Sequence, residues 1–243
     1  TLSGGTHQLT VNQRPLNATL ARQYDGTTEA AGSTISSFDA LQGGETLTMT
    51  GSGTAASANV ANGIAMSSNG NLALADGTGA ASNYSLNSTV INVTQRPINL
   101  SGTKIYDGNT TLNNSIVSVS SGLIGIETLS LTGEVNTNNA NVGSYSASGG
   151  TLNVGSTTIN IANGSNGGLA ANYAINDGNF TITQRPVGVS GTRLYDATTN
   201  AVASDLSTHA NLVGSETLTL SGTGTIASKD VGSNKTVSVG TLA

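Results

Sequence analysis

The chain has 243 residues, a formal net charge of −5 at pH 7 and no cysteine. Only 9% of the residues are charged, and the eight lysines and arginines form no basic patch that would bind nucleic acid. The lack of cysteine excludes disulfides and thiolate metal sites, and no apolar run approaches the ~20 residues of a membrane span. We therefore expect a folded chain with thin cores, many turns and a neutral polar surface.

A Gln-Arg-Pro tripeptide occurs three times, with spacings of 82 and 89 residues. The same offsets relate three Tyr-Asp pairs, three Glu-Thr-Leu segments and three valines, so the chain contains an internal repeat. We divide it into a terminal strand of a preceding repeat (1–12) and three units: unit 1 (13–94), unit 2 (95–183) and unit 3 (184–243), which is incomplete. The tripeptides are Gln13-Arg14-Pro15, Gln95-Arg96-Pro97 and Gln184-Arg185-Pro186.

Alternating apolar residues predict strands throughout the chain. Residues 6–12 carry Leu9 and Val11 and resemble the end of units 1 and 2. Each unit then opens with an alternating strand after its tripeptide and has another at its Glu-Thr-Leu segment. In unit 2, we expect residues 161–168 to form a loop and Asn-Asp-Gly at 176–178 to turn a hairpin. No segment shows a helical period.

Repeats of this length with six or seven short strands predict an all-β fold. Tandem immunoglobulin-like β-sandwiches in an elongated rod fit this length. A β-solenoid is the alternative, because Gly- and Asn-rich segments resemble solenoid coils, although solenoid repeats are usually shorter.

The tripeptide lies directly between two predicted strands, with no Gly/Ser linker. Proline fixes its own φ and holds the preceding arginine extended, so we interpret the tripeptide as a stiff joint between units. We expect its arginine to pair with a recurring acid; a ligand contact is the alternative interpretation.

Twelve of the 21 charged residues recur at four equivalent positions, which indicates internal pairing. The Asp of each Tyr-Asp pair is expected to accept backbone N–H groups in a turn. The Tyr is expected to pack in the core with its hydroxyl bonded to backbone. The recurring acids are Asp25, Glu45, Asp107, Glu127, Asp196 and Glu216.

The sequence gives little support for a cofactor or a catalytic site. A Ca²⁺ site at Asp25 and Glu45 is the alternative interpretation of these acids, but each unit repeats only two carboxylates, and calcium needs six to eight oxygens. The two histidines, His7 and His209, occupy non-equivalent positions. Lys104 is replaced by arginine in the other units, which excludes a recurring lysine–asparagine isopeptide bond. We expect no enzymatic activity.

The order Tyr-Asp-Gly, Glu-led strand, Asn-Val-Gly or Asp-Val-Gly, Asn-Tyr and Thr-Gln-Arg-Pro resembles the YDG and MBG-type repeats of large bacterial surface proteins. Many of these are filamentous-haemagglutinin-like adhesins. The resemblance spans about residues 6–243, although Ala197 replaces the glycine in unit 3 and unit 1 has Asn59-Val60-Ala61. It implies an extracellular stalk at the bacterial cell surface or in the biofilm matrix, and it implies no catalytic residue.

We therefore expect a structural stalk or filament segment, with a glycan- or surface-binding module as the alternative. Its expected partners are copies of itself or adjacent repeats of a longer chain, and a host or matrix glycan under the alternative. The chain has no initiator methionine or signal peptide, so we expect a processed chain or a segment of a longer one. Leu9 and Val11 are the candidate donor strand that would complete unit 3 by strand addition.

Overall fold

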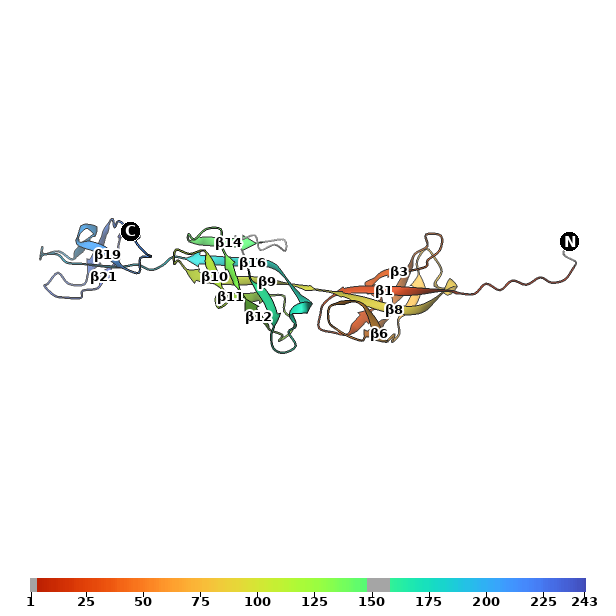
Figure 1. Ribbon diagram of the computed structural model, residues 1–243. Helices are drawn as coiled ribbons and strands as arrows, with labels where there is room; N and C mark the ends of the chain where they lie inside the picture. Colours follow the sequence, from red (N-terminus) through yellow and green to blue (C-terminus); the bar gives the residue numbers. More distant parts are fainter. Residues whose placement is uncertain (1–3, 148–157) are drawn as a thin grey trace.

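The computed structural model describes residues 4–147 and 158–243, which form three β-rich units arranged one after another in an elongated rod (Figure 1). Within these residues the helical turns are short 3-10 segments, so the predicted all-β fold is confirmed. The 3-10 turns are η1 (Gly32–Thr34), η2 (Ala81–Asn83), η3 (Ala170–Asn172) and η4 (Ala203–Asp205).

Unit 1 is built on a six-stranded sheet with the order β2-β5-β6-β8-β1-β3, and a separate antiparallel pair, β4-β7, packs beside it. Leu47 and Met49 of β4 are buried, while the threonine that follows each of them is exposed, as their alternation predicts. The strands are β1 (Arg14–Gln23), β2 (Glu29–Ala31), β3 (Ile35–Phe38), β4 (Leu47–Thr50), β5 (Ser52–Ala55), β6 (Ala61–Ser68), β7 (Ala73–Asp76) and β8 (Tyr84–Thr94).

Unit 2 has a four-stranded sheet with the order β11-β9-β16-β14 and two antiparallel pairs, β10-β13 and β12-β15. Its strands are β9 (Arg96–Ile105), β10 (Thr111–Asn113), β11 (Val117–Ser121), β12 (Leu129–Thr132), β13 (Glu134–Asn136), β14 (Gly143–Ala147), β15 (Asn160–Asn163) and β16 (Tyr173–Thr183).

Unit 3 has smaller sheets, a pair β17-β19 and a three-stranded sheet β18-β20-β21. Its strands are β17 (Gly188–Gly191), β18 (Asn200–Val202), β19 (Leu206–Ala210), β20 (Thr223–Ile226) and β21 (Val237–Ser238).

In units 1 and 2 the first and last strands pair in parallel, and this pairing produces the rod. β1 runs beside β8 over ten residue pairs, from Arg14↔Tyr84 to Gln23↔Thr94, and β9 runs beside β16 in the same way. Parallel strands begin at the same end of a sheet. The chain therefore enters each of these units at one end and leaves it at the other, which places the next unit in line (Figure 1).

Two expectations for unit 2 need correction. The Asn-Asp-Gly at 176–178 does not turn a hairpin but lies within the continuous strand β16, where the register shifts between Ile175 and Asp177. Pairing with β9 on both sides of this bulge outweighs the local turn preference. The predicted loop at 161–168 is a loop only in its second half, because β15 extends to Asn163.

Candidate functional site

The joint between units 1 and 2 consists of one residue between two long strands. β8 ends at Thr94 and β9 begins at Arg96, so only Gln95 separates them, as the sequence predicted. The Gln95 side-chain amide donates to the carbonyl oxygen of Ala171 at 3.2 Å, and Gln13 makes the equivalent contact with Ser82 at 3.0 Å. The glutamine thus attaches the entry strand of a unit to the segment before its last strand.

The arginine of the tripeptide does not pair with a carboxylate, so that expectation was wrong. In each unit its Nε donates to the backbone carbonyl 26 residues further on, at 2.5–2.7 Å. Each carbonyl comes just after strand β3, β11 or β19, and in units 2 and 3 it begins the loop whose glutamate contacts the preceding unit. The arginine therefore holds that loop against the first strand. The pairs are Arg14–Ala40, Arg96–Gly122 and Arg185–Asn211.

The recurring aspartates pair with the second recurring cation of their own unit. Lys104 Nζ lies 2.7 Å from Asp107 and also donates to the carbonyls of Asn109 and Thr111. Asp107 in turn accepts the backbone N–H of Asn109 at 3.0 Å, which confirms the predicted turn. Partial burial opposes ionisation, but the Lys104 and Asn109 hydrogen bonds hold the pKa of Asp107 below its ordinary value. The equivalent pairs are Arg22–Asp25 and Arg193–Asp196.

The recurring glutamate of unit 2 accepts hydrogen bonds from tyrosines of two different units. Tyr24 of unit 1 donates its hydroxyl to Glu127 Oε1 at 2.7 Å, and Tyr173 of unit 2 donates to Glu127 Oε2 at 2.5 Å. The two rings meet edge to face with centroids 5.5 Å apart. We call this arrangement the Tyr–Glu–Tyr bracket. It corrects the expectation that the Tyr24 hydroxyl would bond to backbone.

The bracket lies within a hydrophobic core that continues across the joint. One cluster contains Leu20 and Ile91 of unit 1 together with Ile98 and Tyr173 of unit 2. Burial, followed by the Glu127 hydrogen bond, raises the pKa of Tyr173 to about 12, and the same causes raise the pKa of Tyr24. Both hydroxyls therefore stay protonated at neutral pH and remain able to donate to the carboxylate.

A buried asparagine adds a second polar link across the joint. Asn172, only 1% exposed, accepts the backbone N–H of Val60 at 3.0 Å and donates to the Asn59 side chain at 3.0 Å. The backbones of the two units also approach closely, because a Cβ on Gly26 would lie 3.0 Å from Cγ2 of Ile124. Gly26 also has a φ of +78°, so both its backbone conformation and this close approach favour glycine. The two units consequently meet as closely packed surfaces.

The joint between units 2 and 3 repeats part of this arrangement. Tyr106 donates to Glu216 Oε1, and a Cβ on Gly108 would lie 2.9 Å from Cγ1 of Val213. The hydrogen bond to Glu216 is the main cause that raises the pKa of Tyr106. An open hollow of about 1150 Å³ lies at this joint, lined in part by Tyr106 and Glu216.

The glutamate–tyrosine pairing across units was missed from the sequence. Both residue types recur, but the partners are separated by 103 and 110 residues in the two joints. The available signal was the repeat itself, because one repeat further along the chain Tyr24 and Glu127 are replaced by Tyr106 and Glu216, again a tyrosine and a glutamate. Glu45 of unit 1 makes the same contact with Tyr84 within its own unit.

The candidate donor strand lies outside every sheet in the described part of the chain. Residues 4–13 run away from unit 1 in an extended path (Figure 1), and Leu9 and Val11 are 89% and 86% exposed.

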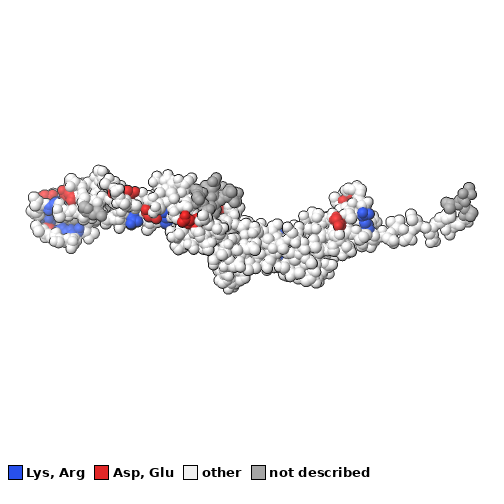
Figure 2. All heavy atoms as spheres, viewed as in Figure 1, with Lys and Arg blue, Asp and Glu red and all other residues white. Residues whose placement is uncertain are grey.

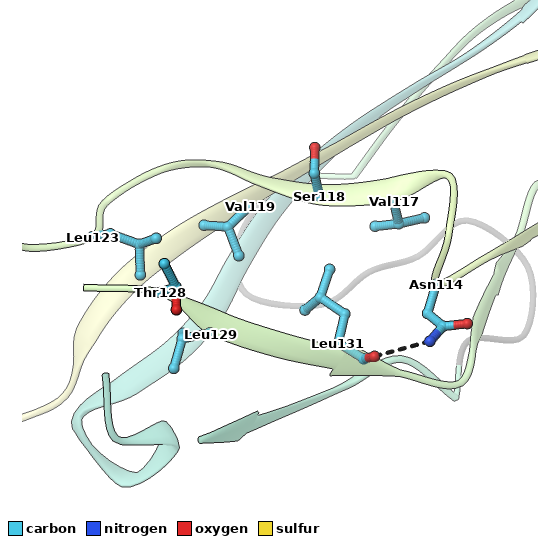
Figure 3. Close-up of a pocket in the computed structure, with 8 residues that line it drawn as sticks. All are labelled: Asn114, Val117, Ser118, Val119, Leu123, Thr128, Leu129 and Leu131. Atoms are coloured by element: carbon cyan, nitrogen blue, oxygen red, sulfur yellow. Dashed lines mark hydrogen bonds between the residues drawn. The ribbon is translucent and has the colours of Figure 1, made fainter. Parts of the chain in front are cut away.

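An open groove of about 290 Å³, lined by apolar and polar side chains in similar measure, lies between β11 and β12 of unit 2 (Figure 3). Val117, Val119 and Leu131 line it, with Asn114 at one end donating to the carbonyl of Leu131 at 3.0 Å. In unit 1 Phe38 pairs with Ala18, whereas in unit 2 Val119 pairs with Leu100, so a smaller side chain borders the groove. No charged side chain lines it, and it brings no acid or base together.

Metal-ligand clusters and membrane-spanning helices were sought among the described residues. These residues contain no cluster of three or more His, Cys, Asp or Glu that could hold a metal ion. Asp25 is engaged by Arg22 and by the N–H of Thr27 at 2.9 Å. In the same residues no helix is long and apolar enough to cross a membrane. His7 is exposed, and the His209 side chain lies outside the described part.

The surface over the first joint is uncharged on the face shown in Figure 2, and charged atoms gather over unit 3, the second joint and the outer end of unit 1. This agrees with the inward position of Glu127, whose carboxylate is bonded to Tyr24 and Tyr173.

Comparison with protein families shows that residues 7–91 and 179–243 match the YDG domain. Searches among curated proteins and among solved structures found no match. The two matched segments include the Tyr-Asp turns of units 1 and 3 and cover more than half of the sequence. The chain therefore belongs to the YDG domain family.

Proposed function

We propose that this protein is a structural stalk or filament segment of a bacterial extracellular adhesin or matrix fibre. Its function would be to keep successive repeats at a fixed spacing and in a fixed direction, so that the line of repeats stays extended. The observation that carries this proposal is the Tyr–Glu–Tyr bracket, in which Glu127 bonds Tyr24 of one unit and Tyr173 of the next inside a shared core.

A stalk must resist bending at its joints, and three features of the first joint oppose bending. The strands are separated only by Gln95, the arginine–carbonyl bond holds the adjacent loop, and the core is continuous. A Gly/Ser linker would instead leave the units free to reorient. The low charge content adds little long-range repulsion between neighbouring stalks.

The extracellular and bacterial assignment rests on the resemblance to surface-protein repeats and on membership of the YDG family. The proposal also includes an immunoglobulin-like β-sandwich for each unit, partners that are copies or adjacent repeats, and completion of unit 3 by strand addition. Extracellular proteins often carry structural disulfides. This chain has no cysteine, so the stiffness of its joints comes from packing and hydrogen bonds.

The alternative, a glycan- or surface-binding module, is supported only by the groove between β11 and β12. Small-molecule sites usually combine apolar walls with a few convergent polar groups. This groove offers Ser118, Thr128 and Asn114 as its polar lining and no aromatic ring. Its open, uncharged form gives a specific ligand little to recognise.

Small-angle X-ray scattering of the monomeric chain tests the stalk. We expect the pair-distance distribution of a rod, unchanged in the control variant Asn114→Ala at the groove. The variant Pro97→Gly together with Glu127→Ala should shift the distribution toward bent particles. A wild-type distribution that fits only an ensemble of many inter-unit angles would contradict the stalk.

A further inference from the structure

Tension along the rod would pass through the strands by which the chain enters and leaves a unit. In unit 1 these strands are β1 and β8, which form ten residue pairs, and in unit 2 they are β9 and β16, which also form ten. Both pairings are parallel, and β1 and β8 run lengthwise between the two ends of unit 1 (Figure 1). We call β1–β8 and β9–β16 the entry–exit pairs.

A pull on the two ends of a unit loads its entry–exit pair in shear. In unit 1 the pull draws β1 backward from Arg14 and draws β8 forward from Thr94. Since the strands are parallel neighbours, these opposite pulls tend to slide one strand along the other. The hydrogen bonds between the strands cross the direction of sliding, so all of them share the load. Strands that are peeled apart from one end instead lose their hydrogen bonds one after another.

The packing of the entry–exit pair also opposes sliding. Leu20 of β1 and Ile91 of β8 are paired, and both are fully buried. A slip by one residue would turn the apolar side chains of the moving strand away from the core. The pair therefore cannot yield by small steps, and its opening must break the hydrogen bonds and the packing together.

An asparagine pair fastens the two strands of unit 1 at a bulge. The register shifts after Leu16, and the extra residue of β8 is Asn87. Its side-chain amide donates to Oδ1 of Asn17 at 2.9 Å, and the hydroxyl of Ser88 donates to the same oxygen at 2.6 Å. The Asn17 amide in turn donates to Oδ2 of Asp39 at 2.7 Å. One side chain thus ties β1 both to β8 and to the segment after β3. We call the Asn17–Asn87 contact and its counterpart in unit 2 the asparagine links.

The same link recurs in unit 2. The side-chain amide of Asn176, the extra residue of β16, donates to Oδ1 of Asn99 at 3.4 Å. The Asn99 amide donates to the hydroxyl of Ser121 at 3.0 Å, so this side chain also contacts β11. The four linked asparagines are not buried, so burial in the core does not explain why they recur. A polar tie across the direction of sliding does explain it.

One backbone hydrogen bond extends each entry–exit pair beyond its last residues. The N–H of Tyr24 donates to the carbonyl of Thr94 at 2.9 Å, and the N–H of Tyr106 donates to that of Thr183 at 2.9 Å. Thr94 and Thr183 end β8 and β16, where the pull of the following unit is applied. The load therefore passes to the neighbouring strand at once and does not fall on a loop.

We propose that the entry–exit pairs are load-bearing clamps that let units 1 and 2 carry tension along the rod without unfolding. Backbone pairing, buried side chains and the asparagine links resist sliding within a unit, whereas the residues of the joint resist bending between units. The inference rests on the proposed stalk, which sets the direction of the load, and it adds tensile strength to stiffness.

Single-molecule pulling on the full chain tests the clamps through the direction of the load. Two introduced cysteines define the attachment points, because the chain has none of its own. Asn12→Cys with Gln184→Cys pulls units 1 and 2 along the rod, whereas Asn12→Cys with Asn83→Cys pulls the beginnings of β1 and β8 apart. All three positions are exposed. The length of chain released identifies the unit that opens.

Unit 1 should open at roughly twofold higher force along the rod than by peeling, because ten residue pairs then share the load. Forced unfolding is governed by the unfolding barrier along the direction of the pull. The free energy of unfolding has no direction and cannot produce such a difference. Equal opening forces in the two geometries would overturn the proposal.

Asn17→Ala tests the asparagine link of unit 1, and unit 2 of the same molecule is the internal control. Along the rod, the variant should lower the opening force of unit 1 and leave that of unit 2 unchanged. The peeling force should fall much less, because bonds then break one at a time. An equal loss in both geometries, or no loss in either, would overturn the role of the link. The comparison of directions leaves β1 and β8 unaltered, so the clamp stays testable if Asn17→Ala fails to fold.

These results separate the clamp from the stalk proposal. Scattering reports bending at the joints without load, whereas pulling reports the resistance of each unit to stretching. A straight rod whose unit 1 opens at equal force in both geometries keeps the stalk and overturns the clamp. A chain with flexible joints whose unit 1 still resists tension along the rod more than peeling overturns the stalk and keeps the clamp.

Discussion

Replacing Glu127 by alanine should uncouple units 1 and 2. The carboxylate accepts one hydrogen bond from Tyr24 and one from Tyr173, so the substitution removes two contacts and leaves both hydroxyls without this acceptor. Unit 1 loses its principal polar attachment to unit 2, while the strands that run through Gln95 remain.

The magnitude follows from the two hydrogen bonds. A hydrogen bond to a charged group contributes about 1.5–3 kcal/mol net, and the partial exposure of this site favours the lower end. Relief of the carboxylate's desolvation offsets part of the loss. We expect the free energy of unfolding to fall by about 2–3 kcal/mol. Glu45→Ala, the matched control, breaks one bond within unit 1 and should cost about 1.5 kcal/mol.

A double-mutant cycle isolates the contact between units. Urea unfolding of wild type, Tyr24→Phe, Glu127→Ala and the double variant should give a coupling energy of about 1.5 kcal/mol for the Tyr24–Glu127 pair. The unfolding transition of Glu127→Ala should also broaden or split, because units 1 and 2 lose cooperativity. A coupling energy below about 0.5 kcal/mol with an unchanged transition would refute the role of the bracket.

Three further outcomes are expected. Ala197→Gly should stabilise unit 3 by about 0.5–1 kcal/mol in urea unfolding, because Ala197 has a φ of +63° where Gly26 and Gly108 occupy the equivalent position; an unchanged or lowered midpoint would contradict this. The pKa of Tyr173 is raised from 10 to about 12, so its contribution to the free energy of unfolding is complete below pH 10 and is lost as the pH rises toward 12. Urea unfolding at increasing pH should show this decline in stability for the wild type and a smaller decline for Tyr173→Phe. An equal decline in both proteins would contradict this prediction. Arg96→Ala should lower the free energy of unfolding by about 1–2 kcal/mol through loss of its bond to Gly122; Arg96→Lys should recover only part, since Nε provides the contact, and full recovery would show that charge alone suffices.

The repeat spacing predicted the main features of the rod because equivalent residues occupy equivalent environments. Alternation in Leu47-Thr48-Met49 identified a half-buried strand, and Tyr-Asp-Gly identified the turn at Asp25. These signals are local, so the sequence contains them directly.

The partners across the joint could not be predicted in the same way. Tyr24 and Glu127 lie 103 residues apart and meet only because β1 and β8 run parallel and pass the chain on to the next unit. The partner of Arg96 was predicted wrongly for a related reason. Acids are scarce in this chain and Arg96 bonds to a backbone carbonyl, and because every residue has a carbonyl, the sequence does not indicate which one will accept the bond. Asn-Asp-Gly at 176–178 predicted a hairpin because the local sequence contains no sign of the pairing between β16 and β9, which keeps this segment extended.

Stiffness of the first joint is the central claim, and a distance distribution between spin labels on units 1 and 2 tests it most directly. Labels on the variant Thr54→Cys/Ser130→Cys, both at exposed positions, report the joint, and Ser37→Cys/Thr54→Cys within the sheet of unit 1 gives the width of a rigid pair. We predict one peak for the joint, about as narrow as that of the control pair. A broad or multiple distribution across the joint, beside a narrow control, would contradict the account.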